Sequence, residues 1–178
     1  MDLQIRKAHS ADAEIIALLG RITFSETFGY LFVDHASDLR AYLDHTLAVA
    51  KIRLSIEQPE NTYWLALIDA LPVGYAKLKL PSPAALLPAA SIAQLQKIYV
   101  LKEFLGQGIG KPLFESVLDH VTSLKIDVLW LDVLKKNSRA IRFYERHGFK
   151  ALGDETYTIG AQTFTFHLMA LQGLAPSA

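Results

Sequence analysis

Three closely spaced glycines form the part of this sequence best suited to binding an anion. They lie in the stretch Leu105-Gly106-Gln107-Gly108-Ile109-Gly110, after an alternating apolar run over residues 95–101. Apolar residues at helical spacing follow, beginning with Ile109 and Leu113. A glycine-rich turn between a strand and a helix leaves backbone N–H groups unpaired, and the helix dipole adds positive potential there. The stretch therefore predicts a site for an anion such as a pyrophosphate.

The spacing of these glycines excludes two common nucleotide-binding motifs. The phosphate loop of nucleotide hydrolases requires glycine where this chain has Leu105, and Ser or Thr where it has Pro112. The dinucleotide fingerprint requires a third glycine where this chain has Lys111. A tight turn into a helix would use the same glycines without any ligand, so the turn alone leaves both interpretations open.

Composition limits the class of protein. The 178 residues suffice for one domain with a sizeable core, and 51% of them are hydrophobic. Lys plus Arg and Asp plus Glu number 18 each, so the net charge is zero. Nucleic acid is not expected as the main partner, because neutralising phosphates needs a clustered basic excess. A neutral surface opposes self-association only weakly, so a homodimer and a monomer both remain open.

Several kinds of site and location are also disfavoured. The chain has no cysteine, which removes disulfides, thiolate metal sites and a cysteine nucleophile, and which fits a reducing cytosol. The histidines are scattered without the close pairing of zinc ligands, so no metal is expected. The N-terminus lacks the apolar core of a signal peptide, and no apolar run approaches the length that spans a bilayer. We therefore expect a soluble, cytoplasmic protein without membrane association.

The elements that must position the glycine turn follow from periodicity. Their interleaved order predicts an α/β fold with one mixed sheet and helices on both faces. We expect one domain over residues 1–172 and a frayed tail over residues 173–178. The predicted strands cover residues 3–6, 62–69, 72–80, 92–101, 127–134, 149–159 and 162–170; the predicted helices follow Ser10 or Asp12, cover 38–56 as one or two segments, and cover 110–124 and 137–148.

A second stretch of interest lies one strand after the glycine turn. In it, Asn137 or Ser138 caps a helix, Ile141 and Tyr144 face inward, and Gly148 ends the helix. An ordinary amphipathic helix explains most of this composition. It does not explain why the helix follows the glycine turn by one strand.

The two stretches together make the chain resemble the GNAT superfamily of acyl-CoA-dependent N-acetyltransferases. The specific part covers about residues 94–150, and residues 23–28 and 38–43 are similar to the PaiA-like branch, which acetylates spermidine and spermine. The resemblance implies a single-domain GNAT-type fold with a mixed, mostly antiparallel sheet. The residues that carry it are Ile98, Tyr99, Val100, Gly106, Gln107, Gly108, Ile109, Gly110, Asn137, Ala140, Phe143, Tyr144, Gly148 and Phe149.

The resemblance also implies roles for individual residues. Backbone groups of Ile98 and Val100 would pair with the pantetheine arm of acetyl-CoA, and Asn137 would bond the cofactor near that arm. Tyr144 would lie near the sulfur and donate a proton or a hydrogen bond to the leaving thiolate. The pyrophosphate would be held by the backbone of Leu105, Gly106, Gln107, Gly108, Ile109, Gly110 and Lys111.

One position departs from the family pattern. The residue before Gly106 is usually Gln or Arg in this family, whereas here it is Leu105. A hydrogen bond to a charged group contributes about 1.5–3 kcal/mol, so its loss would weaken cofactor binding without abolishing it. Lys111 or Lys102 is placed in the sequence to supply compensating charge.

The reaction requires a base for the ammonium proton, donors for the developing oxyanion and an acid for the sulfur. The ordinary tyrosine pKa of about 10 exceeds the thiol pKa of about 8.5, so Tyr144 stays protonated at neutral pH and can donate to the sulfur. A tyrosine packed in the core would look the same in the sequence. Gln96 lies where some relatives carry glutamate and cannot take a proton. Glu26 is our candidate base; His35, His45 and a chain of ordered water are the alternatives.

These inferences predict an acetyltransferase that transfers acetyl from acetyl-CoA directly to a small primary amine. A polyamine is the leading acceptor, because the segment with Glu26, Asp34, Asp38 and Asp44 is acidic, although a solvated helix face would be acidic as well. The alternatives are acetylation of a protein N-terminus or lysine, and a catalytically weak acyl-CoA-binding regulatory module.

Overall fold

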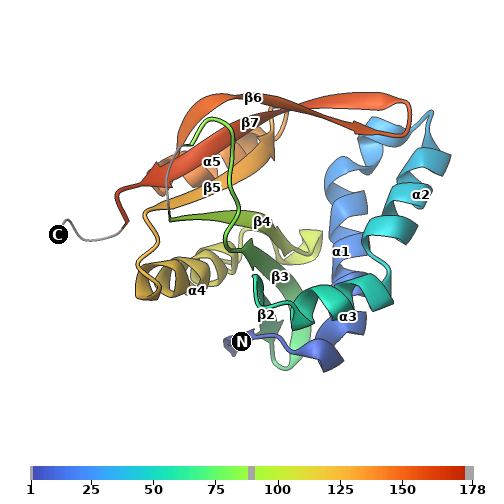
Figure 1. The fold of residues 1–178 in the computed structure, drawn as a ribbon. Coiled ribbons are helices and arrows are strands. Elements are labelled where there is room, and N and C mark those ends of the chain that lie inside the picture. Colours follow the sequence, from blue (N-terminus) through green and yellow to red (C-terminus); the bar gives the residue numbers. More distant parts are fainter. Residues whose placement is uncertain (1, 88–90, 175–178) are drawn as a thin grey trace.

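Seven strands form one sheet in a computed structural model that describes residues 2–87 and 91–174 (Figure 1). Their order is β1-β2-β3-β4-β5-β7-β6, and every neighbouring pair is antiparallel except β4 and β5. This arrangement confirms the predicted α/β fold with a mixed, mostly antiparallel sheet. The strands are β1 Leu3–Lys7, β2 Asn61–Ile68, β3 Leu71–Lys79, β4 Ile92–Val100, β5 Val128–Leu134, β6 Lys150–Ile159 and β7 Gln162–Gln172.

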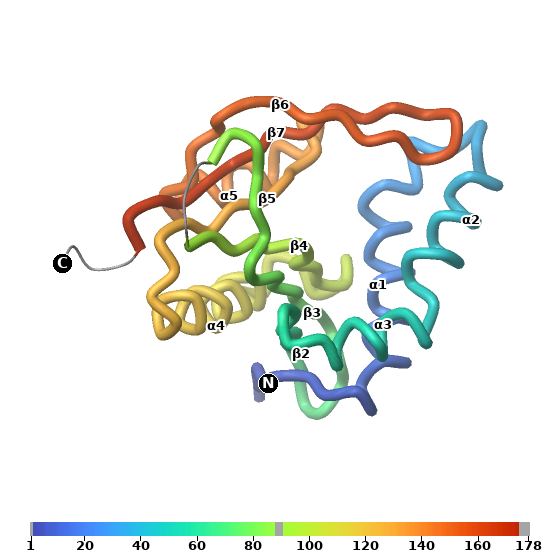
Figure 2. Tube along the Cα trace, viewed as in Figure 1, coloured from blue at the N-terminus to red at the C-terminus, as the bar shows by residue number. Residues whose placement is uncertain are grey.

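Helices cover both faces of this sheet (Figure 2). Because successive side chains of a strand point to opposite faces, Tyr63 and Leu65 of β2 pack with α1–α3, whereas Trp64 and Ala66 pack with α4 and α5. The α-helices are α1 Ala13–Phe28, α2 Ala36–Thr46, α3 Val49–Glu57, α4 Gly110–Ser123 and α5 Ser138–Arg146, and the 3₁₀ helices are η1 Ser10–Asp12, η2 Gly29–Phe32 and η3 Lys102–Phe104.

The sheet opens between its two parallel strands. β4 and β5 pair at only three positions, the last being Gln94 with Trp130. From there to Val100, β4 has β3 as its one strand neighbour in the described part of the chain, so one edge of its backbone has no strand partner. Gln96 is an extra residue in the register of β4 against β3, and such a bulge redirects neighbouring side chains. Open backbone and a bulge thus lie at the middle of the sheet.

The expectation that no apolar run approaches the length that spans a bilayer is wrong for one segment. The segment Ser10–Phe32 has 23 residues and is long and apolar enough, by length and composition alone, to cross a membrane. It passes this test because its charges are few and widely spaced. Its Ile16 and Phe24 belong to the core, whereas Leu18 is 55% exposed. The segment therefore packs one side on the sheet of this domain.

The chain after β7 is described only as far as Leu174. The backbone N–H of Leu174 donates to the carbonyl oxygen of Asp127 at 3.2 Å. Residues 175–178 of the predicted tail lie outside the described residues.

Candidate active site

The glycine turn presents a group of unpaired backbone donors. Gly106 and Gly108 have φ angles of +83° and +81°, a left-handed conformation that strains residues with a Cβ atom. Pro112, in the first turn of α4, has no N–H to leave unpaired. Together with the dipole of α4, the turn suits an anionic group such as a phosphate. In the described part of the chain, the backbone N–H groups without an acceptor include those of Gly106, Gly108, Ile109, Gly110 and Lys111.

Two residues of the same stretch use their N–H groups locally. The N–H of Leu105 donates to the carbonyl oxygen of Lys102 at 3.1 Å. The N–H of Gln107 donates to Phe104 at 3.4 Å, and its side chain donates to the carbonyl oxygen of Glu103 at 2.8 Å. The unpaired donors are therefore the N–H groups of Gly106 and of residues 108–111.

A cleft of about 610 Å³ connects the turn with the open edge of β4. Ile98 and Tyr144, two predicted cofactor residues that are 46 positions apart in the sequence, both line this cleft. Gln107 does not line the cleft. The predicted cofactor residues that line it are Ile98, Val100, Leu105, Gly106, Gly108, Ile109, Gly110, Lys111, Asn137 and Tyr144.

Cations outnumber carboxylates along the cleft. Lys102, Lys111, Arg139 and Arg146 line it, and Lys111 also pairs with Glu115 of its own helix at 3.3 Å. Sequence reasoning missed the two arginines, although their spacing of seven residues places them on one face of α5. The positive potential of these side chains favours a ligand with several phosphate charges.

Tyr144 of α5 and Asn137, the residue that caps this helix, line the cleft with groups that can form hydrogen bonds. The Oδ1 atom of Asn137 accepts from the backbone N–H of Ala140 at 3.1 Å and so caps α5, which leaves its amide N–H₂ available. Tyr144 is 8% exposed, and its hydroxyl has no hydrogen-bond partner among the described residues. Burial raises the pKa of Tyr144 well above its ordinary value, so the phenol is protonated at neutral pH.

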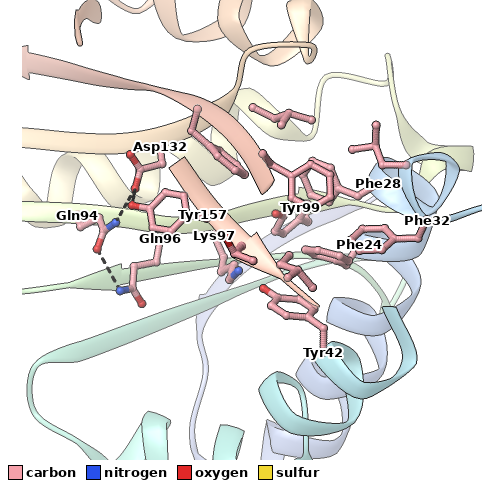
Figure 3. A pocket seen from close by; sticks show the side chains of 16 residues that line it. Phe24, Phe28, Phe32, Tyr42, Gln94, Gln96, Lys97, Tyr99, Asp132 and Tyr157 are labelled. Atoms are coloured by element: carbon pink, nitrogen blue, oxygen red, sulfur yellow. Dashed lines mark hydrogen bonds between the residues drawn. The ribbon is translucent and has the colours of Figure 1, made fainter. Parts of the chain in front are cut away.

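A second cavity, the inner pocket, adjoins the cleft and has a volume of about 380 Å³ (Figure 3). Gln96, Lys97, Tyr99 and Asp132 are among the residues that line both cavities. Figure 3 shows polar Gln94, Gln96 and Asp132 at one end and a group of aromatic rings at the other. The aromatic residues of the inner pocket are Phe24, Phe28, Phe32, Tyr42, Tyr99, Tyr157, Phe164 and Phe166.

Asp132 is the carboxylate at the junction of the two cavities. Its Oδ2 accepts from the Tyr157 hydroxyl at 2.9 Å and from Gln94 Nε2 at 3.5 Å, whereas its Oδ1 is buried without a partner. Burial raises the pKa of Asp132, and the nearby charge of Glu155 raises it further, against the opposing effect of the Tyr157 hydrogen bond. Sequence reasoning missed this residue, although a lone charge within the apolar strand β5 was a signal for it.

The side chains predicted as candidate bases do not line the inner pocket. Glu26 Oε2 accepts from the backbone N–H of Lys102 at 3.0 Å and lines the cleft but not the inner pocket. His35 lies 3.8 Å from Asp38 and His45 lies 3.4 Å from the Lys51 ammonium; neither histidine lines either cavity. The assignment of Glu26 as the base remains a prediction.

Comparison with known proteins identifies the class. The model of the acetyltransferase (GNAT) family matches residues 24–149, and the chain belongs to this family. An N-acetyltransferase of Lactobacillus delbrueckii subsp. lactis is 28% identical over 88% of each chain. The spermine/spermidine N(1)-acetyltransferase of Bacillus subtilis is 30% identical over 34% of this chain and 40% of its own.

A solved structure agrees with the fold. The PaiA N-acetyltransferase of Thermoplasma acidophilum, solved in complex with coenzyme A, has a TM-score of 0.78 with this chain. It covers 97% of this chain and 99% of its own, at 21% sequence identity. The family and the fold thus define an N-acetyltransferase of the GNAT type.

Proposed function

We propose that this N-acetyltransferase transfers the acetyl group of acetyl-CoA to a primary amine of a small molecule bound in the inner pocket. The observation that carries the proposal is the position of Asp132, a half-buried carboxylate that lies where the inner pocket meets the cleft and whose Oδ1 has no hydrogen-bond partner among the described residues. At about 380 Å³, the inner pocket lies within the range of small-molecule sites, roughly 300–1,000 Å³.

The cleft fits coenzyme A through groups of this chain. The unpaired N–H groups of Gly106 and of residues 108–111 would hold the pyrophosphate, with Arg139 and Arg146 adding charge. The open edge of β4 at Ile98 and Val100 would bond the amide groups of pantetheine as a neighbouring strand does. Bound acetyl-CoA supplies an activated acetyl thioester.

Two side chains would handle protons. A primary amine has a pKa near that of lysine, about 10.4, so it reaches the pocket as an ammonium ion and must lose a proton before it attacks. Asp132, whose side chain lines both cavities, accepts that proton on its carboxylate. Tyr144, protonated and directed to the cleft, donates a hydrogen bond to the departing sulfur.

A polyamine is one candidate acceptor. The short match to a spermine/spermidine N(1)-acetyltransferase supports it, and the aromatic rings of the inner pocket can contact a second ammonium group. A protein N-terminus or lysine remains the alternative, and a binding module without turnover remains the alternative outside enzymes.

Thiol release from acetyl-CoA in the presence of an amine panel tests this proposal. We expect thiol release with at least one small amine, and kcat lower by about tenfold or more in Tyr144→Phe, with an unchanged dissociation constant for acetyl-CoA. Tyr30→Phe is the control, because Tyr30 is 59% exposed and lines neither cavity. Acetyl-CoA binding without turnover on any small amine would refute the proposal.

A further inference from the structure

The inner pocket contains a lysine that the proposed reaction does not use. Lys97 follows the bulge residue Gln96 on β4, and both residues line both cavities. Figure 3 shows Lys97 between Gln96 and Tyr42, within the inner pocket. The Lys97 side chain is mostly buried, and burial lowers its pKa.

A second lysine increases the positive charge beside Lys97. Lys77 of β3 is the residue directly opposite Lys97 in the register, and its ammonium lies 5.5 Å from the centre of the Tyr63 ring. Burial, together with the smaller effect of the charges of Lys97, Lys79 and Lys51, lowers the pKa of Lys77 to about 8. Like charges directly opposite each other on paired strands are unfavourable.

Among the residues that the structure describes, no anionic side chain pairs with these two lysines. Within the described residues, neither Lys97 nor Lys77 forms a salt bridge or a side-chain hydrogen bond. Asp132 is the one carboxylate that lines the inner pocket in this part of the chain, and it is hydrogen-bonded to Tyr157 and Gln94 instead. Mostly buried cations are normally paired, so an anion from outside the chain would satisfy this arrangement.

From this arrangement, and building on the proposed function, we propose that Lys97 binds a carboxylate of the acceptor. The acceptor is then an amino carboxylate, with its amine at Asp132, its carboxylate at Lys97 and an apolar body against the aromatic rings. This assignment disfavours a polyamine, because a polyamine brings only positive charge to a pocket that already holds Lys97.

Matched pairs of acceptors test the inference. We propose to compare L-phenylalanine with L-phenylalaninamide and L-leucine with L-leucinamide, with spermidine as the polycation. Thiol release gives kcat and KM, and calorimetry on the CoA-loaded enzyme gives acceptor binding without turnover. We expect each acid to bind about tenfold to a hundredfold more tightly than its amide, as for a hydrogen bond between charged groups. Equal or tighter binding of the amides or of spermidine would overturn the inference.

Lys97→Met is the decisive variant, because it removes the charge and keeps an unbranched side chain. It should weaken binding of the acids about tenfold or more and leave binding of the amides unchanged. Lys79→Met is the matched control on β3, since Lys79 lines neither cavity, and it should keep the preference for acids. An unchanged preference in Lys97→Met would also overturn the inference.

The outcomes separate this inference from the proposed function. Binding of acids that depends on Lys97, without thiol release, would support the carboxylate site and refute acetyl transfer to these acceptors. Thiol release with amines regardless of their carboxylate would support the transfer and refute the site. If Lys97→Met does not fold, the preference of the unaltered enzyme for acid over amide decides.

Discussion

At the scale of single residues, one phenol between two carboxylates sets the chemistry of the junction. The Tyr157 hydroxyl lies 2.9 Å from Asp132 Oδ2 and 2.8 Å from Glu155 Oε2. A phenol has one proton to donate, so the two carboxylates compete for it. Asp132 is also half-buried, which disfavours its charged form. Its affinity for a proton is thereby higher than that of an ordinary aspartate, as a base for an ammonium requires.

This environment predicts the pH dependence of the enzyme. The raised pKa of Asp132 means that the base is lost as the pH falls through that pKa, so kcat/KM should fall on the acid side. In Asp132→Asn, kcat/KM should be lower by about a hundredfold, and the Asp132 step should be absent from the profile. The measurement is thiol release against pH at saturating acetyl-CoA.

Glu26→Gln is the comparison for this experiment, since Glu26 lines the cleft and bonds the N–H of Lys102. We expect it to keep the acid-side step. If Glu26→Gln removes the step and Asp132→Asn keeps it, Glu26 is the base and the assignment of Asp132 fails.

At the scale of elements, the glycine turn and α4 act as one anion site. The left-handed conformation of Gly108 directs the following N–H groups to the cleft, and an added Cβ would meet no other atom within 4 Å. In Gly108→Ala, backbone strain of about 1–2 kcal/mol is therefore expected without a steric clash. The turn should relax toward a different conformation, and KM for acetyl-CoA should rise several-fold.

Steady-state kinetics with varied acetyl-CoA measure this effect, and thermal unfolding reports the accompanying loss of stability. Gly29→Ala is the matched control, because Gly29 also has open space around its Cβ position but a helical φ of −54°. An unchanged KM in Gly108→Ala would show that the conformation of the turn does not contribute to cofactor binding.

The pattern of neighbouring residues explains why these elements could be predicted from the sequence. It does not reveal the gap between β4 and β5. The glycine turn, the cap at Asn137 and the alternating strands depend on neighbours in sequence, so the sequence predicts them. The short pairing of β4 with β5 and the bulge at Gln96 depend on how distant strands meet. The sequence therefore indicates Tyr144 on its helix. It marks Asp132 only as a lone charge in an apolar strand and does not place it at the inner pocket.

At the scale of the whole molecule, distant segments enclose the inner pocket. Phe24 of α1 and Tyr42 of α2 line it from one side. The β6–β7 hairpin lines it from another, through Tyr157, Thr158, Ile159, Phe164 and Phe166. The tip of the hairpin reaches α2, where Asp38 Oδ2 accepts from the backbone N–H of Ala161 at 3.0 Å (Figure 1). This contact joins residues 123 positions apart and holds the hairpin over the pocket.

Asp38→Ala should therefore loosen the hairpin tip without touching the cofactor cleft, which Asp38 does not line. Loss of one hydrogen bond predicts a rise in KM for the acceptor of about threefold to tenfold, while KM for acetyl-CoA stays constant. Hydrogen exchange of the amides near Ala161 should become faster. Asp34→Ala, an exposed aspartate on the same segment, should change neither measurement. Faster exchange with an unchanged acceptor KM would show that the hairpin tip does not shape the acceptor site.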